Sequence, residues 1–298
     1  MKVANTEIEI DGRLLRIARL AADGYEFVDD PEPVLSGLRK SHGRPDLFTF
    51  MQGLIDPSPR FKYPMEWDNF AAIPISTFDN WWNNQIRSFP RNRARQAEKR
   101  GVVLREVPFS DELVQGIWKV YNECPVRQGK PFRHFGKDLK TVYREEATYL
   151  DTSLFIGAYL GDELIGFVKM TWDQKKTQAN LMNIISMMGH KDKAPTNALI
   201  AHSVRACADR GIQYLVYQSF SYGKKQEDSV SHFKEVNGFQ KIDIPRYYVP
   251  LTAFGTLALR LRLHHKWIDR IPQPIIAKLR NARGAWYNRK LKVVTEAS

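Results

Sequence analysis

Between residues 102 and 249, the apolar pattern predicts strands and helices in the order β-α-α-β-β-β-α-β-α-β. A strand from Val102 to Val107 comes first, and Ser110 then caps a helix. The strands expected at 153–159 and 163–172 are separated by Leu-Gly-Asp, a short connection that joins antiparallel strands. This order predicts an α/β (α+β) fold, in which a mixed central sheet is flanked by helices.

Six further elements are expected in this region, and local residues mark where two of the helices end. They are a helix at 137–150, a strand at 179–188, a helix at 195–210, a strand at 214–218, a helix at 226–236 and a last strand or strand pair within 239–249. Gly211 and the pair Asn237-Gly238 follow two of the helices, as expected where a helix ends. No segment repeats another, so a solenoid is not expected.

The first hundred residues predict shorter elements. These are a hairpin at 7–20 that turns at Asp11-Gly12, a helix from Asp30-Pro31 to near Gly43, a strand at 47–51, a helix capped by Ser76 or Thr77, and a helix from Pro90 to Arg100 that Gly101 ends. The prolines between Pro57 and Pro74 leave no room for long helices or strands, so an ordered loop is predicted there.

The net charge of +12 comes from two segments. Residues 253–298 carry a local +8 and residues 86–101 a local +5, so the rest of the chain is close to neutral. Hydrophobic residues make up 43% of the chain, enough for a buried core in one or two domains. Basic patches favour an anionic partner, but the sequence contains no motif that reads nucleic acid, and we expect no DNA partner.

The cysteines and the N-terminal residues favour a cytoplasmic protein. Cys124 and Cys207 lie far apart and outside any CxxC or clustered Cys/His spacing, so neither a disulfide framework nor a metal site is expected. Residues 1–7 lack the apolar run of a signal peptide, and no window approaches the roughly 18 apolar residues of a membrane span.

Three segments of the chain carry a resemblance to a known superfamily. Ile156–Phe167, Ile-Gly-Ala-Tyr-Leu-Gly-Asp-Glu-Leu-Ile-Gly-Phe, is similar to the hairpin of the GNAT acyltransferase fold. Phe233–Phe239, Phe-Lys-Glu-Val-Asn-Gly-Phe, is similar to its late signature, a helix that leads into a strand. Pro90–Val102, with Arg-Asn, Ala, Lys and Gly-Val, is similar to the segment by which Fem-like enzymes enter the second of two GNAT-like halves.

The resemblance covers about residues 76–250 and implies an acyltransferase. It implies transfer of an activated acyl or aminoacyl group, from acyl-CoA or aminoacyl-tRNA and without a metal, to an amine or hydroxyl of a cell-envelope or polysaccharide precursor. The acceptor would be a small molecule or a lipid-linked one. Three parts are expected: a reduced N-terminal half (1–100) that ends in a basic helix, a catalytic domain (101–252) and a basic helical tail (253–298).

A GNAT-like fold implies a place for the donor. In that fold two neighbouring strands diverge and leave backbone groups free for the donor, and these strands would be 179–188 and 214–218. The loop before the helix at 195–210 leads into the N-terminus of that helix, where the free amides and the helix dipole favour an anion. The loop lacks the glycine-rich run with which acetyl-CoA enzymes hold a pyrophosphate, so the donor stays open, and a solvated capping loop is the alternative. The candidate donor-binding residues are His190, Lys191, Lys193, Thr196 and Asn197.

Three residues are candidates for catalysis. The resemblance implies that the ammonium of Lys234 stabilises charge at the reacting carbonyl, as the Phe-Lys pair of Fem-like enzymes does; the alternative is an exposed helix lysine. His232 can accept a proton near neutral pH, and Asp173, just beyond the strand at 163–172, is another candidate base.

Other candidates would bind substrate. Three cations spaced four residues apart share one helix face, where they can clamp a phosphate or form a solvated basic surface. The polar loop near residue 130 lies where the fold usually contacts the acceptor, and two tyrosines follow the strand at 214–218. These candidates are Arg91, Arg95 and Lys99, then Arg127 and Arg133, then Tyr217 and Tyr222.

The tail leaves a second class of function open. Its apolar residues follow helical spacing from Ile275 to Trp286 among basic residues, which predicts a basic amphipathic helix. Such a helix can lie on the inner face of an anionic membrane or pack on the N-terminal half. The alternative to an enzyme is therefore an inactive GNAT-like module that binds nucleic acid or an anionic membrane through its basic helix and tail.

Overall fold

The computed structural model describes residues 1–298 except 128–129, 174, 221–228, 266–281 and 283–298. The chain forms two compact units, each built from separate stretches of sequence. The first unit contains Met1–Ala72, Val216–Glu227 and Gln240–Arg270, and the second contains Ile73–Leu215, Asp228–Phe239 and Ile271–Ser298. Among the described residues, the first unit takes segments from both sides of the divisions expected at residues 100 and 252, and the second takes residues from both sides of residue 100.

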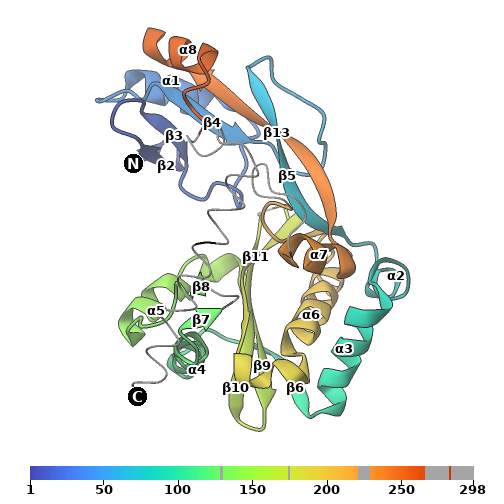
Figure 1. The fold of residues 1–298 in the computed structure, drawn as a ribbon. Coiled ribbons are helices and arrows are strands. Elements are labelled where there is room, and N and C mark those ends of the chain that lie inside the picture. Colours follow the sequence, from blue (N-terminus) through green and yellow to red (C-terminus); the bar gives the residue numbers. More distant parts are fainter. Residues whose placement is uncertain (128–129, 174, 221–228, 266–281, 283–298) are drawn as a thin grey trace. The chain divides into compact units, whose positions relative to one another are not determined.

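The first unit is built on a mixed sheet. Its described strands lie in the order β1-β2-β3-β4-β13-β5, with bounds Lys2–Val3, Thr6–Asp11, Ile17–Leu20, Leu47–Met51, Gln240–Pro250 and Met65–Pro74. β3 and β4 are parallel, and the other pairs are antiparallel. β13 therefore lies between β4 and β5, two strands from the first quarter of the chain (Figure 1).

Apolar side chains of β4 and β13 form the core of the first unit together with helix α1 (Glu32–Lys40). The rings of Phe48, Phe50 and Tyr247 stack in sequence and are fully buried. The hydroxyl of Tyr247 donates to the side-chain oxygen of Gln52 at 2.8 Å and accepts from the amide of Arg60 at 2.8 Å, so its polar end is satisfied inside the core.

The prediction of a loop between Pro57 and Pro74 is wrong for its second half. β5 occupies Met65–Pro74, and β13 pairs with it from Met65 to Ala72. Pro64 lies just before the strand and Pro74 is its last residue, so neither removes a hydrogen bond from the middle of the ladder. The expected hairpin at 7–20, the helix after Pro31 and the strand at 47–51 are confirmed.

The second unit also contains a stretch of sheet, with helices on both faces. Its described strands lie in the order β12-β11-β10-β9-β6, with bounds Tyr214–Val216, Gln178–Ser186, Glu163–Trp172, Ser153–Leu160 and Val102–Val107. Helices α3 (Ser88–Lys99) and α6 (Pro195–Asp209) cover one face, and α4 (Asp111–Asn122) and α5 (Leu139–Glu146) cover the other (Figure 1). The order of elements predicted for residues 102–249 is confirmed.

Local sequence signals set most helix boundaries in the second unit. Ser110 and Asp138 accept hydrogen bonds from the amides of Leu113 and Thr141, so α4 and α5 begin with side-chain caps. Helix α3 begins two residues before Pro90, where that proline falls in the first turn. The short elements α2 (Phe78–Asn80), the π-helix η1 (Trp81–Gln85), η2 (Leu150–Thr152) and the pair β7 (Val126–Arg127) and β8 (Lys130–Pro131) complete this part.

β11 is longer than its neighbour β12. The amides of Gln213 and Tyr214 donate to the carbonyl of Thr177 at 3.1 Å each, so the two strands start side by side. β12 has three residues and β11 has nine. Side chains at the start of β11 are buried, whereas those from Met182 to Ser186 are only half-buried. The C-terminal half of β11 therefore extends beyond β12.

A tryptophan joins the start of the second unit to helix α7 (Ser229–Val236). The indole N–H of Trp81 donates to the carbonyl of Asn237 at 3.0 Å, and the ring is fully buried. Gly238 follows with a φ of +88°, and a Cβ there would lie 2.9 Å from the indole nitrogen. Only glycine permits both this backbone conformation and this contact.

Replacing Gly238 with alanine should cost more stability than the same change at Gly211. Both residues end a helix with positive φ, +88° and +70°, so both variants carry the left-handed strain of about 1–2 kcal/mol. A Cβ at Gly211 would meet nothing within 4 Å, whereas at Gly238 it would meet the Trp81 indole. Urea unfolding measures the free energy of unfolding of both variants. Equal losses would contradict the proposed tryptophan contact.

Candidate active site

The loop between β11 and α6 contains the expected donor-binding residues, and its amides already bind an internal carboxylate. Its 3-10 helix η3 (Met188–Lys193) begins with amides of Met188 and Gly189 that donate to the two carboxylate oxygens of Glu123 at 3.1 and 2.8 Å. Glu123 lies at the end of α4. The backbone at the start of this loop thus binds an anion, and that anion is a side chain of the same unit.

Two arginines of the segment around α3 hold the same loop from the other side. Arg93 donates to the carbonyl of Lys191 at 2.9 Å, and Arg100 donates to the carbonyl of Asp192 at 2.8 Å and to its carboxylate at 3.1 Å. Sequence analysis did not single out either arginine. Part of the basic charge of this segment therefore binds the η3 loop.

The candidate donor residues lie together on this loop and on the first turn of α6. His190 faces the carboxylate of Glu163 at 3.5 Å, and Lys193 lies 3.5 Å from Asp192. The hydroxyl of Thr196 is hydrogen-bonded to that of Ser186, the last residue of β11, at 2.7 Å. Lys191 lies within η3, and Asn197 lies in the first turn of α6. The end of β11 is therefore tied to the start of α6.

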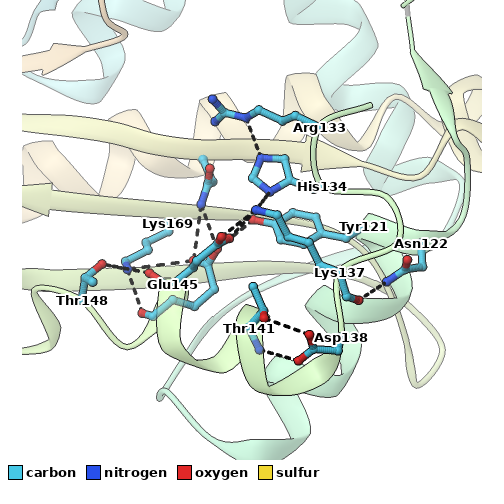
Figure 2. Close-up of polar contacts among 12 residues, drawn as sticks. Tyr121, Asn122, Arg133, His134, Lys137, Asp138, Thr141, Glu145, Thr148 and Lys169 are labelled. Atoms are coloured by element: carbon cyan, nitrogen blue, oxygen red, sulfur yellow. Dashed lines mark hydrogen bonds and ion pairs between the residues drawn. The ribbon is translucent and has the colours of Figure 1, made fainter. Parts of the chain in front are cut away.

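A buried polar network lies between helices α4 and α5 and the strands β10 and β11 (Figure 2). The carboxylate of Glu146 accepts from the hydroxyl of Tyr121 at 2.7 Å and from the amide of Asn183 at 3.1 Å. The ammonium of Lys169 donates to the carbonyl of Glu146 at 2.7 Å and to the hydroxyl of Thr148 at 2.9 Å. Four elements meet at this point, and Lys169 and Glu146 are almost completely buried.

Burial shifts the ionisation of this network toward neutral forms. Burial raises the pKa of Glu146, against the opposing effects of Tyr121, Lys169 and Asn183. Burial lowers the pKa of Lys169, although Glu146 opposes the shift. The ammonium and the nearer carboxylate oxygen are 3.9 Å apart, so each charge that remains is partly compensated by the other. We interpret the network as the support that positions α5 and β11.

His134 stacks on this network as a neutral imidazole. Its ring lies 4.2 Å from that of Tyr121, and its two nitrogens face Arg133 at 2.9 Å and Lys137 at 3.2 Å. Burial, then the charges of Lys137 and Arg133, lower its pKa from 6.5 to about 4. Arg133 therefore contacts a histidine of the same unit, at the place where the sequence suggested contact with an acceptor.

The three candidate catalytic residues lie in different surroundings. The side chain of Lys234 on α7 is fully buried, so it is not the exposed helix lysine of the alternative interpretation. His232 lies two residues earlier on the same helix and is exposed, so it points away from Lys234. Asp173 accepts from the amides of Thr177 and Gln178 at 2.6 and 3.0 Å and thereby shapes the β10–β11 turn. The structure does not bring these three together.

The candidate substrate-binding residues are mostly engaged by neighbours. Arg91 donates to the carbonyl of Trp82 at 3.0 Å, Arg95 lies over the Trp82 ring at 5.4 Å, and Lys99 is exposed. Arg127 donates to the carbonyls of Ser186 and Val120 at 2.7 and 3.0 Å. Tyr217 pairs through its backbone with Ala71 in the first unit. Tyr222 lies outside the described residues, and so does the expected amphipathic helix from Ile275 to Trp286 apart from residue 282.

Sequence analysis missed Glu123 and the network of Glu146 and Lys169. One signal was available, because Lys169 interrupts an apolar run from Leu164 to Met170. A lysine inside a strand that is otherwise apolar on both faces has to find a buried partner. Glu123 gave no such signal, since a glutamate at the end of a helix is common.

Comparisons with solved structures identify the fold. The C-terminal domain of a protein described as a lysylphosphatidylglycerol synthetase from Agrobacterium fabrum has a TM-score of 0.55 at 13% identity, over 87% of this chain and 86% of that one. L-PGS from Bacillus licheniformis has a TM-score of 0.57 at 12% identity, over 88% and 87%. FemX has a TM-score of 0.48 at 12% identity, over 75% and 70%.

The expected α/β fold, a mixed sheet flanked by helices, is therefore confirmed, and the first two of these structures share it over most of their length. No family model matches the chain, and no curated protein matches it. Among the described helices, none combines the length and the apolar character that crossing a membrane requires.

The buried histidine predicts a pH dependence of stability. Because the pKa of His134 is about 4 in the folded chain and its usual value is 6.5, the unfolded chain binds this proton first as the pH falls. Folding stability should decrease between pH 6.5 and 4, by up to about 3 kcal/mol. His134→Gln should flatten this decrease in denaturant titrations, and His232→Gln, which removes an exposed imidazole, should not. An unchanged slope in His134→Gln would contradict this assignment.

Proposed function

We propose that the protein transfers an activated aminoacyl or acyl group to an amine or hydroxyl of a cell-envelope or polysaccharide precursor. The observation that carries this proposal is the complete burial of Lys234 on α7, within Phe-Lys-Glu-Val-Asn-Gly-Phe, the segment that resembles the late signature of Fem-like enzymes. Burying an ammonium costs several kcal/mol after relaxation. A lysine at this position places a cation in a site of low dielectric constant.

The chemistry assigned to Lys234 is electrostatic. When an amine or hydroxyl attacks an activated carbonyl, negative charge develops on the carbonyl oxygen. A cation held in a site of low dielectric stabilises that charge more strongly than it would in water. The half of β11 that extends beyond β12 supports this proposal. A strand that is longer than its neighbour has backbone groups that a donor can reach.

The donor that fits best is an aminoacyl-tRNA. A coenzyme A pyrophosphate would use the amides at the start of η3, where the Glu123 carboxylate already accepts from Met188 and Gly189. A pyrophosphate there would have to displace this carboxylate and would be repelled by it. The name of the matched Agrobacterium fabrum protein, a lysylphosphatidylglycerol synthetase, also points to transfer of an amino acid to a lipid.

The alternative of an inactive module that binds anionic surfaces has less support from the described residues. Arg93 and Arg100 hold the η3 loop, and Arg91 and Arg95 contact Trp82. Lys99 extends from this segment into solvent. Most of the charge that suggested a binding surface on α3 is thus used within the second unit.

Lys234→Met should reduce the turnover number by about 10²–10³-fold, as expected when a group that stabilises an oxyanion is removed. The assay supplies charged tRNA or acyl-CoA with lipid and amine acceptors and measures the transferred group. The donor should still raise the melting temperature of the variant, because donor binding does not require the ammonium. Lys119→Met, which removes an exposed lysine of α4, is the matched control and should keep full activity.

Two results would count against the proposal. One is a folded Lys234→Met variant that keeps its turnover number within a few-fold of the unaltered chain. The other is an unaltered chain that neither transfers a group from any of these donors nor gains thermal stability from them.

A further inference from the structure

Three side chains of the first unit converge at the edge of its sheet. Glu66 lies near the start of β5, and His264 and His265 follow helix α8 (Ala253–Arg260). The Nε2 atoms of His264 and His265 lie 3.2 and 2.8 Å from the same carboxylate oxygen, Oε1 of Glu66. The two imidazole rings are 4.3 Å apart. The three possible ligand atoms lie within 4.8 Å of one another.

The backbone after α8 brings the two histidines to this carboxylate. The helix ends at Arg260, the amide of Leu263 donates to the carbonyl of Ala258 at 2.8 Å, and Arg262 has a φ of +54°. This left-handed residue turns the chain back toward the sheet. The ring of His264 then lies 4.6 Å from that of Tyr248 on β13, and its side chain is 2% exposed.

We propose that Glu66, His264 and His265 bind a divalent transition-metal ion of the zinc class through the carboxylate and the two Nε2 atoms. Zinc bonds of roughly 2.0–2.1 Å in a tetrahedron place neighbouring ligand atoms about 3.3 Å apart. The measured separations of 3.2 and 2.8 Å are close to this edge length. Each imidazole nitrogen therefore needs to move away from the carboxylate oxygen by no more than about half an ångström.

The ligand types select the metal. Imidazole nitrogen suits zinc, copper and nickel, whereas magnesium and calcium prefer sites made of oxygen ligands alone. Two histidines and one carboxylate are also three protein ligands, which leaves a fourth position for water or another group. Glu66 and His265 are partly exposed, so an ion can reach the site.

The second ring nitrogen of His264 bears on the strength of the site. Metal binding at Nε2 places the ring proton on Nδ1, which is buried and has no acceptor among the described residues. Because an outer acceptor usually strengthens such a site, the affinity should be about 10–100-fold weaker than in a site that has one.

The test uses the full chain after treatment with EDTA and dialysis. Titration with Zn²⁺ by calorimetry near neutral pH should show one ion per chain, and excess Mg²⁺ should not compete. Co²⁺ should give the intense visible absorption of a four-coordinate site, and Zn²⁺ should abolish it. Thermal unfolding should shift upward with Zn²⁺, since an ion that binds only the folded chain stabilises it.

Glu66→Gln, His264→Gln and His265→Gln should each weaken Zn²⁺ binding by at least tenfold. Because the side chains of Glu66 and His265 are 40% and 32% exposed, these two variants should fold even if His264→Gln does not. His42→Gln removes an exposed histidine of the same unit and should bind Zn²⁺ as the unaltered chain does.

Failure to bind Zn²⁺, or binding that Glu66→Gln and His265→Gln leave unchanged, would overturn the proposal. So would an equal loss in His42→Gln, which would indicate dispersed binding to surface histidines. The outcome is independent of the proposed transferase function, because the three ligands belong to the first unit and Lys234 belongs to the second.

Discussion

The second unit depends on one buried polar pair. Glu146 and Lys169 lie where water cannot solvate them, so hydrogen bonds to Tyr121, Asn183 and Thr148 have to replace those that water would make. Because the pair and its partners come from both helices on one face and from two strands, satisfying these polar groups also fixes the positions of α4, α5, β10 and β11. The geometry of the half of β11 beyond β12 follows from this network.

The loop after β11 is fixed in a similar way, by polar side chains instead of apolar packing. Glu123 binds its amides, Arg93 and Arg100 bind its carbonyls, and Thr196 is bonded to Ser186. A loop held on both sides keeps its shape without a ligand, so a substrate would bind with little loss of conformational freedom. Glu123 occupies backbone amides that a phosphate could otherwise use. For this reason the proposed donor is aminoacyl-tRNA, which need not place a pyrophosphate at this loop.

The sequence predicted elements whose boundaries are local and missed features that depend on distant partners. Ser110, Gly211 and the pair Asn237-Gly238 mark helix ends by their own chemistry, so the order of elements from 102 to 249 could be read directly. β5 could not be found this way, because its strand character depends on pairing with β13. The candidate site follows the same rule. The sequence named candidate residues on the loop at 188–197, but the contacts of that loop with Glu123 and Arg100 form only when α3 and α4 pack beside it.

The place of β13 between β4 and β5 has a consequence for biosynthesis. Those two strands are translated early, but the strand that joins them is completed only at Pro250. Until the ribosome has released that part of the chain, β4 and β5 each lack the neighbour that β13 supplies, and open strand edges of this kind pair readily with other chains. The first unit thus begins synthesis before the second and can complete its sheet only after most of the second has been made, so its open strand edges stay exposed during that period.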